Sequence, residues 1–330
     1  MDILFFSTQP YDKEYFNKAN EQGAHRFRFL EYPLNEDNTA LIKDERAVCV
    51  FVNDKVNAAV IRQLKEKGIR LIALRCAGFN NVDLKAAAEA GIRLVRVPAY
   101  SPHAVAEHAV ALLLALNRKI YKAYNRVRDN NFTLSGLEGF DLYGKTVGVI
   151  GTGNIGAVFC RIMRGFGCRV LAHDLYSNED LEKAGVEYSS VDSILSSSDI
   201  ISLHCPLTPD TKHLVNWHTI VKMKPGVTLI NTSRGGLIDT KSVVEALKTG
   251  HIGGLGIDVY EQEEQLFFQN FSGTIIQDDV LSRLTTFPNV LITAHQGFFT
   301  REALTQIAET TLQNINSFEK NEALLNEIKL

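Results

Sequence analysis

The 330-residue chain lacks the cysteine pattern that builds a disulfide framework or a zinc site. Its five cysteines are an odd number, and no two of them are separated by two residues. Disulfide-stapled domains and zinc-binding domains both depend on paired cysteines at short, regular spacings. We therefore expect reduced thiols and no metal site, as is typical of a cytoplasmic protein.

Long apolar runs and a strong net charge are also missing. The longest apolar run, residues 109–116, is far shorter than the ~20 residues that cross a bilayer. The N-terminus has no basic segment followed by a long apolar stretch, so it predicts a first strand and not a signal peptide. With 35 Lys and Arg against 38 Asp and Glu, the net charge is −3. We expect neither nucleic acid nor a membrane as a partner, because this balance gives no long-range attraction to either.

The chain does contain a regular alternation of strand-like and helix-like segments, which is typical of an α/β fold with parallel sheets. The first series ends near residue 97, and a second series begins near Lys145. The expected strands are 3–6, 27–30, 47–51, 71–74 and 93–97, followed by 146–150, 170–172, 200–204, 227–232, 254–259 and 290–294. The second series matches a doubly wound nucleotide-binding domain.

Other segments lie between and after the two series. Residues 102–118 predict a helix that is apolar nearly all round, so we expect it to be buried between layers or between domains. The polar segment 125–141, interrupted by Gly136 and Gly139, is interpreted as an excursion, with contact to a partner subunit as one reason for it. Residues 300–321 predict a final amphipathic helix.

A glycine-rich turn follows the strand 146–150 and precedes a helical segment. In Gly151-Thr152-Gly153-Asn154-Ile155-Gly156, the first glycine would allow a tight turn and the second a close approach to a pyrophosphate. The third would let helix and strand pack closely. This spacing alone also fits a tight turn without a ligand. The next strand, however, ends in Asp174, whose carboxylate would accept hydrogen bonds from ribose hydroxyls and repel a 2′-phosphate. The combination predicts NAD, and not NADP, as the cofactor.

Three side chains follow successive strands at the sheet edge where open α/β sheets bind ligands: Arg234, Glu263 and His295. Reduction of a keto acid needs a cation for the carboxylate, best supplied by a forked guanidinium. It also needs an acid for the carbonyl oxygen and a carboxylate that keeps this acid protonated. The sequence leaves alternatives open, since Arg234 and Glu263 also fit solvated loop residues. His204, which ends a strand too, competes with His295 for the role of the acid.

The ordered set of motifs resembles that of the D-specific 2-hydroxyacid dehydrogenases, over nearly the whole chain. It comprises the glycine turn with Asp174, His204-Cys205-Pro206-Leu207-Thr208-Pro209, Asn231-Thr232-Ser233-Arg234-Gly235, Asp258-Val259-Tyr260-Glu261-Gln262-Glu263 and Ala294-His295-Gln296. The flanking segments, among them Arg75-Cys76-Ala77-Gly78-Phe79-Asn80 and Gly297-Phe298-Phe299-Thr300, resemble the fermentative, lactate-forming branch. That branch reduces pyruvate to D-lactate with NADH.

The resemblance implies a role for each site residue. Arg234 would bind the substrate carboxylate and polarise the carbonyl, His295 would donate the proton in reduction, and Glu263 would hold His295 charged and oriented. Substrate contacts are implied for Ala77, Gly78, Tyr100, Arg234 and Phe298. Cofactor contacts are implied for Gly151, Gly153, Asn154, Ile155, Gly156, Asp174, His204, Cys205, Pro206, Thr211, Thr232, Ser233 and Asp258. Ser233 departs from relatives that often carry alanine or glycine there, and Glu263 argues against the formate-oxidising branch, which has glutamine.

The resemblance also implies how the chain is organised. A flavodoxin-like substrate (catalytic) domain, residues 1–100 plus 299–330, would carry an inserted Rossmann NAD-binding domain, residues 101–298. The segment before Asp141 resembles the dimerisation arm of the family, so a homodimer or homotetramer is expected. Two other functions remain open: reduction of a bulkier keto acid such as phenylpyruvate, and an NAD-sensing, peptide-binding co-repressor. The compact chain, without a disordered tail, argues against the co-repressor.

Overall fold

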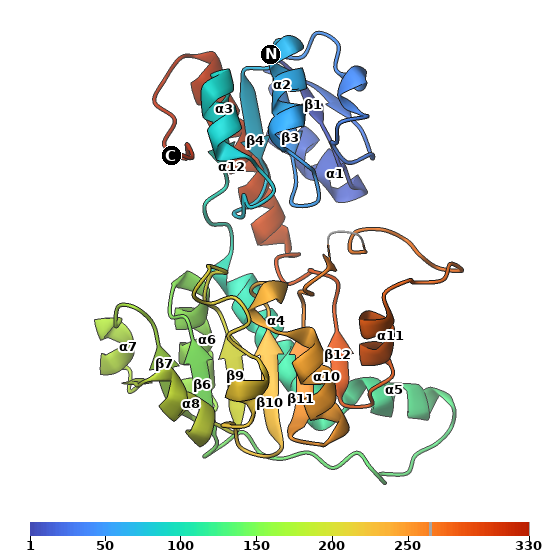
Figure 1. Cartoon of the computed structure of the whole chain (residues 1–330), viewed down its shortest axis with the longest axis vertical. Helices are drawn as coiled ribbons and strands as arrows, with labels where there is room; N and C mark the ends of the chain where they lie inside the picture. Colours follow the sequence, from blue (N-terminus) through green and yellow to red (C-terminus); the bar gives the residue numbers. More distant parts are fainter. Residues whose placement is uncertain (264–265, 330) are drawn as a thin grey trace. The chain divides into compact units, whose positions relative to one another are not determined.

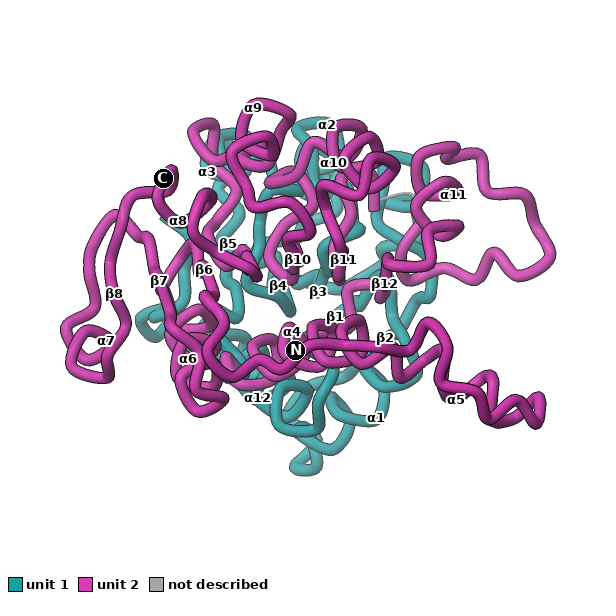
Figure 2. Tube along the Cα trace, turned by 90° about the horizontal axis from the view of Figure 1, so that it is seen from below, with its two compact units in different colours: residues 1–101, 299–330 teal, residues 102–298 magenta. Residues whose placement is uncertain are grey.

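The computed structural model describes residues 1–263 and 266–329, and its strands form two separate parallel sheets (Figure 1). Each sheet belongs to one compact unit. Unit 1 comprises residues 1–101 and 299–330, and unit 2 comprises residues 102–298 (Figure 2). The predicted α/β class is therefore confirmed. The expected division into a substrate domain and an NAD domain concerns function and stays a prediction at this point.

Unit 1 contains a five-stranded sheet in the order β2-β1-β3-β4-β5. Its strands are β1 (Asp2–Phe5), β2 (Arg26–Phe29), β3 (Ala47–Val50), β4 (Leu71–Leu74) and β5 (Arg93–Arg96). Its helices are α1 (Pro10–Ala19), the 3-10 turn η1 (Thr39–Leu41), α2 (Ala58–Glu66), α3 (Leu84–Ala90) and α12 (Arg301–Glu319). All residues of β3 and β4 are buried, as expected for central strands covered by helices on both faces.

The helices of unit 1 begin and end where their sequence provides caps. The side chains of Asn57 and Asp83 accept hydrogen bonds from backbone N–H groups in the first turns of α2 and α3. α3 ends at Gly91, whose φ of +70° is the left-handed conformation that favours glycine. The last helix, α12, packs against α1 and against β4 and β5. Unit 1 is therefore completed by residues from both ends of the chain.

Unit 2 contains a seven-stranded sheet in the order β12-β11-β10-β9-β6-β7-β8. Its strands are β6 (Thr146–Ile150), β7 (Arg169–His173), β8 (Glu187–Tyr188), β9 (Ile200–Leu203), β10 (Val227–Asn231), β11 (Ile252–Ile257) and β12 (Val290–Ile292). Its helices are α4 (Pro102–Arg118), α5 (Ile120–Arg128), α6 (Asn154–Gly165), α7 (Glu179–Lys183), α8 (Val191–Ser197), α9 (Trp217–Ile220), η2 (Gly235–Leu237), α10 (Thr240–Lys248) and α11 (Asp279–Thr285). The order of the strands reverses between β6 and β9, which is the point where sheets of this kind bind ligands.

Two apolar cores cover the faces of this sheet. Residues of α4 and α6 form one core, and residues of α8, α9, α10 and α11 form the other. α4 packs closely on the strands. A Cβ atom on Gly256 of β11 would lie only 3.0 Å from the Leu116 side chain of α4. The prediction that residues 102–118 form a buried helix is thus confirmed.

Two expectations about unit 2 were wrong in detail. The sheet has a seventh strand, β8, which the six expected strands did not include, because a two-residue strand leaves no recognisable apolar run. The polar excursion expected at 125–141 is helical as far as Arg128, since α5 occupies Ile120–Arg128. No residue of α5 is buried, so this helix is not held by a core of its own chain. No helix within the described residues is both long enough and apolar enough to cross a membrane.

Candidate functional site

The glycine turn lies between β6 and α6, at the carboxyl end of β6. Gly151 has a φ of +97°, and a Cβ atom there would lie 2.4 Å from the backbone nitrogen of Cys205. A Cβ atom on Gly156 would lie 1.9 Å from the carbonyl oxygen of Gly151. A Cβ atom on Gly153 would meet nothing within 4 Å. Two glycines are therefore required by close packing, and the third faces open space into which a ligand could approach the backbone.

The start of α6 offers donors to a ligand in that space. The N-cap position is Gly153, which has no side chain to satisfy the first N–H groups of the helix, among them those of Asn154 and Ile155. Such a helix end is favourable for a phosphate group. Nearby in the same unit, the hydroxyl of Thr232 is buried and has no hydrogen-bond partner among the described residues. The residues present thus fit a dinucleotide such as NAD.

Asp174 directly follows β7, and its carboxylate is held firmly. Its Oδ2 accepts hydrogen bonds from the backbone nitrogen of Thr152 at 2.5 Å and from the Thr152 hydroxyl at 3.2 Å. Its Oδ1 accepts one from the backbone nitrogen of Leu175 at 2.7 Å. The Tyr188 hydroxyl donates to the Thr152 hydroxyl at 2.8 Å. This network fixes a negative charge beside the glycine turn, as the prediction of NAD over NADP requires.

Hydroxyl groups make one hydrogen bond between the loops after β9 and β10 and another within the loop after β9. The Ser233 hydroxyl donates to the carbonyl oxygen of Cys205 at 2.7 Å. The Thr211 hydroxyl donates to the carbonyl oxygen of Pro206 at 2.6 Å. Ser233, which stands where relatives often carry alanine or glycine, therefore links the two loops.

The two candidate histidines differ in their surroundings. The Nε2 atom of His204 lies 2.8 Å from the Ser202 hydroxyl, and its ring packs against Phe159 with 4.9 Å between ring centroids. Burial lowers the pKa of His204 from 6.5 to about 3, so this ring is neutral at physiological pH. A neutral imidazole with so low a pKa is a poor proton donor. The structure thereby argues against His204 as the acid.

His295 has a carboxylate partner. Its Nδ1 atom lies 2.9 Å from Oε1 of Glu263, and both side chains are about one-fifth exposed (19% and 20%). The second carboxylate oxygen of Glu263 accepts a hydrogen bond from the backbone nitrogen of Tyr260, which fixes its orientation. This contact occupies Nδ1 and leaves Nε2 as the ring nitrogen that can meet a substrate.

Arg234 follows β10 and is half-buried. Its Nη1 atom donates to the carbonyl oxygen of Ser233 at 2.7 Å. Across the described part of the chain, the guanidinium has no carboxylate within ion-pair distance, although Glu263 and His295 follow neighbouring strands of the same sheet. The structure thus brings Glu263 and His295 into contact and leaves the charge of Arg234 unpaired by any described acid.

Asp258 organises the turn that carries His295. Its carbonyl oxygen accepts from the backbone nitrogen of His295 at 2.7 Å, and its carboxylate accepts from those of Gln296 at 2.9 Å and Gly297 at 2.7 Å. Burial acts to raise the pKa of the Asp258 carboxyl, but hydrogen bonds from His108 and Thr293 outweigh it and hold this pKa below its usual value. Sequence reasoning missed both His108 and Thr293.

The remaining predicted substrate residues lie elsewhere in the chain. Ala77 and Gly78 follow β4 in unit 1, where Arg96 donates to the carbonyl oxygen of Ala77 at 2.8 Å and the Cys76 thiol to that of Gly78 at 3.3 Å. Tyr100 is the next-to-last residue in the first segment of unit 1, and Phe298, the last residue of unit 2, is buried. Their roles as substrate contacts stay predictions.

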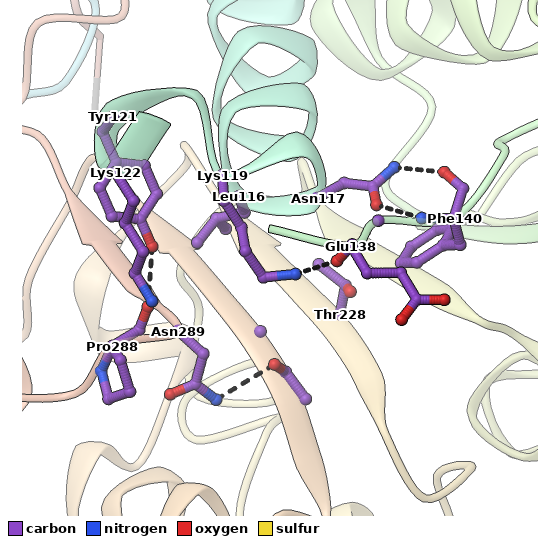
Figure 3. Close-up of a pocket in the computed structure, with 13 residues that line it drawn as sticks. Leu116, Asn117, Lys119, Tyr121, Lys122, Glu138, Phe140, Thr228, Pro288 and Asn289 are labelled. Atoms are coloured by element: carbon purple, nitrogen blue, oxygen red, sulfur yellow. Dashed lines mark hydrogen bonds between the residues drawn. The ribbon is translucent and has the colours of Figure 1, made fainter. Parts of the chain in front are cut away.

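A pocket of about 500 Å³ lies at the opposite edge of the unit 2 sheet and includes none of the predicted site residues (Figure 3). Its walls come from the starts of β10 and β11, the residues before β12, and the segment after α4. Within the described residues, no cluster of three or more potential metal-ligating side chains was found.

Comparisons with known proteins are consistent with this geometry. Residues 110–297 match the family described as "D-isomer specific 2-hydroxyacid dehydrogenase, NAD binding domain". The chain is 54% identical to "2-hydroxyacid dehydrogenase homolog 1" of Schizosaccharomyces pombe, over 96% of each chain. It is 52% identical to "D-lactate dehydrogenase" of Escherichia coli, over 99% of this chain and 100% of that protein. A solved structure titled "Identification of the pyruvate reductase of Chlamydomonas reinhardtii" superimposes with a TM-score of 0.94 at 46% identity, covering 99% of this chain and 98% of that one.

The chain belongs to the D-isomer specific 2-hydroxyacid dehydrogenase family, whose members are NAD-dependent oxidoreductases. The match to the NAD-binding domain confirms the predicted cofactor, and it lies within unit 2, which carries the glycine turn and Asp174.

Proposed function

We propose that the protein is an NAD-dependent D-lactate dehydrogenase that reduces pyruvate to D-lactate. The observation that carries the proposal is the contact between His295 and Glu263, because it supplies an oriented proton donor at a sheet edge suited to a nucleotide. The choice of pyruvate is supported by relatives named D-lactate dehydrogenase and pyruvate reductase at 52% and 46% identity.

When bound, NADH would supply a hydride to the carbonyl carbon of the keto acid. His295 donates the proton that the carbonyl oxygen needs, from its Nε2 atom, and Glu263 stabilises the charged ring from the other side. The guanidinium of Arg234 binds the substrate carboxylate and polarises the carbonyl, and it is available for this because no described carboxylate pairs with it. One pyruvate, one NADH and one proton thus give one D-lactate and one NAD⁺.

Residues of unit 2 would hold the cofactor. The helix N-terminus at Asn154 would bind the pyrophosphate, and Asp174 would bind the adenosine ribose. The hydroxyl of Thr232 has no partner among the described residues and would be able to donate a hydrogen bond to the cofactor. Substrate contacts come from the backbone N–H groups of Ala77 and Gly78 and from the side chains of Tyr100 and Phe298. These roles follow the family resemblance of the motifs that contain them.

The quaternary structure is proposed from the segment that follows α4. Side chains of Ile120, Tyr124, Val127, Phe132 and Leu134 are all more than half exposed, and an isolated monomer rarely exposes so many apolar groups together. Covering them with a second copy of the chain would give a homodimer or a homotetramer. We place the enzyme in the cytoplasm, which fits the buried, unpaired cysteines Cys49, Cys160, Cys168 and Cys205.

The test is a substrate panel with the purified protein. Pyruvate with NADH should cause loss of NADH absorbance, and the product should be consumed by a D-specific, and not an L-specific, lactate assay. A preference for phenylpyruvate over pyruvate would move the protein to a sister activity within the family. His295→Gln should cut kcat by at least about 100-fold, in the range lost with a general acid, while NADH still binds. Retention of turnover in that variant would mean that another group donates the proton.

A further inference from the structure

The backbone of His295 has a conformation that needs support. Its φ of +52° lies in the left-handed region, which is unfavourable for a residue other than glycine. Three consecutive N–H groups, those of His295, Gln296 and Gly297, all donate to the single residue Asp258. The position of the proton-donating ring therefore depends on where the Asp258 carboxylate is held.

Asp258 is itself held by a histidine from the first helix of unit 2. The Nε2 atom of His108, on α4, lies 2.9 Å from the Thr293 hydroxyl and 3.3 Å from Oδ1 of Asp258. The Thr293 hydroxyl donates its proton to that same Oδ1. Its oxygen must therefore accept from His108, so the Nε2 atom of His108 carries a hydrogen. Donation runs from His108 through Thr293 to Asp258.

The turn packs directly on this group. A Cβ atom on Gly297 would lie 2.9 Å from Oδ2 of Asp258 and 3.4 Å from a ring carbon of His108. Asp258 is 2% exposed and the His108 side chain 16%, so water has little access to replace a lost donor. A shift of the Asp258 carboxylate would be passed to residues 295–297 through the two backbone hydrogen bonds and through this contact.

We propose that His108 is a positioning residue for His295. By donating to Thr293 and Asp258, it fixes the carboxylate that anchors the 295–297 turn. The 295–297 turn then keeps Nδ1 of His295 within hydrogen-bond distance of Glu263 and presents Nε2 to the substrate. This inference rests on the proposed role of His295 as the proton donor.

The groups that surround His295 show what a displaced turn would change. Glu263 is the only carboxylate in contact with the ring among the described residues, and the Phe268 ring lies 5.9 Å away. Loss of the contact with Glu263 would leave the ring without the carboxylate that orients it. Turnover would then fall while NADH binding stays nearly unchanged, because the proton donor would no longer be held at the substrate.

The experiment compares three variants. His108→Leu fills the same space but cannot donate, whereas His108→Gln places an amide donor near the position of Nε2. His218→Leu, on the exposed face of α9, serves as the matched control. For each we would measure kcat and KM for pyruvate, the Kd for NADH by fluorescence, and Tm.

We expect His108→Leu to lower kcat by about tenfold, since small displacements of a catalytic group cost this much or more. The Kd for NADH should change by less than about threefold. His108→Gln should recover kcat to within about threefold of wild type, and His218→Leu should match wild type.

Three results would overturn the proposal. The first is an unchanged kcat in His108→Leu. The second is a loss of activity that glutamine does not rescue, because this would indicate packing alone. The third is a Kd for NADH that weakens as much as kcat falls, which would assign His108 to cofactor binding.

A crystal structure of ligand-free His108→Leu separates this inference from the proposed function. We expect a displaced 295–297 turn and a lost contact between His295 and Glu263. An unmoved turn would refute the positioning role even if the enzyme reduced pyruvate. A displaced turn would support it even if the wild-type protein preferred another keto acid.

Discussion

At the scale of single residues, environment and not residue type distinguishes the two histidines that follow strands β9 and β12 of the same sheet. His204 contacts a hydroxyl and an aromatic ring, and burial lowers its pKa to about 3. His295 contacts the carboxylate of Glu263. The same imidazole is thus kept neutral at one position and is paired with a negative charge at the other, as their proposed roles in cofactor and proton binding require.

The low pKa of His204 predicts a pH-dependent cost to stability. In the unfolded chain this histidine binds a proton below about pH 6.5, whereas in the folded protein it does so only near pH 3. The unfolded state therefore binds more protons between these values, and stability falls as the pH drops through this window. The cost reaches at most about 2 kcal/mol at pH 5.

The measurement is Tm for wild type and His204→Gln at pH 7.5 and pH 5. The variant should gain stability relative to wild type as the pH falls, because glutamine carries no such penalty. A Tm difference that stays constant across this range would show that His204 does not titrate between the two states as its burial indicates.

The carboxylate of Asp174 should determine the relative affinity of the protein for NADH and NADPH. Replacing it by alanine removes the carboxylate that Thr152 and Leu175 hold beside the glycine turn. We expect NADH to bind about tenfold more weakly and NADPH to gain relative to it, since one repulsive charge and one or two hydrogen bonds are lost. The ratio of Kd values for the two cofactors measures this, and an unchanged ratio would remove Asp174 from ribose binding.

At the scale of elements, the glycine turn predicts opposite effects for two similar substitutions. Gly156→Ala would place a methyl group against the Gly151 carbonyl and should cost about 1–3 kcal/mol or more, because helix and strand must move apart. Gly153→Ala meets open space and should leave Tm nearly unchanged, while its methyl group obstructs the approach of a pyrophosphate. Thermal melts and NADH titrations of both variants test the contrast, which would be refuted by equal losses of Tm.

Most elements could be predicted from the sequence, and the exceptions have physical causes. The strands 71–74 and 146–150 have the bounds predicted for them, because each is an apolar run of ordinary strand length. β8 was not predicted, because the two residues Glu187 and Tyr188 are too few to form a recognisable pattern. α5 was not predicted, because its sequence is mostly polar and none of its residues is buried.

The site was predictable only where a local motif marks it. Glu263 and His295 belong to recognisable segments, and the structure brings them together. No role was predicted for His108, since its contact with Thr293 joins residues 185 positions apart. One signal was present: a histidine within the apolar helix 102–118 needs a hydrogen-bond partner when that helix is buried. The sequence could not say which partner it would find.

At the scale of the whole molecule, the exposed apolar side chains after α4 predict self-association. Changing both Tyr124 and Val127 to aspartate should convert the assembly to a monomer, because each is more than half exposed and would bring an unpaired charge into an interface. Molar mass by light scattering after size-exclusion chromatography measures this. Ile275→Asp, at a side chain that is 84% exposed elsewhere in unit 2, is the control. An unchanged mass in the double variant would place the interface on another surface.

The assembly of unit 1 from both ends of the chain has a consequence for biosynthesis. A ribosome delivers the first 101 residues early, but α12, which packs on β4 and β5, emerges last. All strands of unit 2 have been synthesised before α12 emerges. Unit 2 can therefore fold while the sheet of unit 1 still lacks the helix that covers it. During that interval the growing chain exposes apolar strand faces that α12 will later bury. Newly made chains should therefore depend most on chaperones before α12 emerges, and messages truncated before α12 should yield protein that is degraded and not merely shortened.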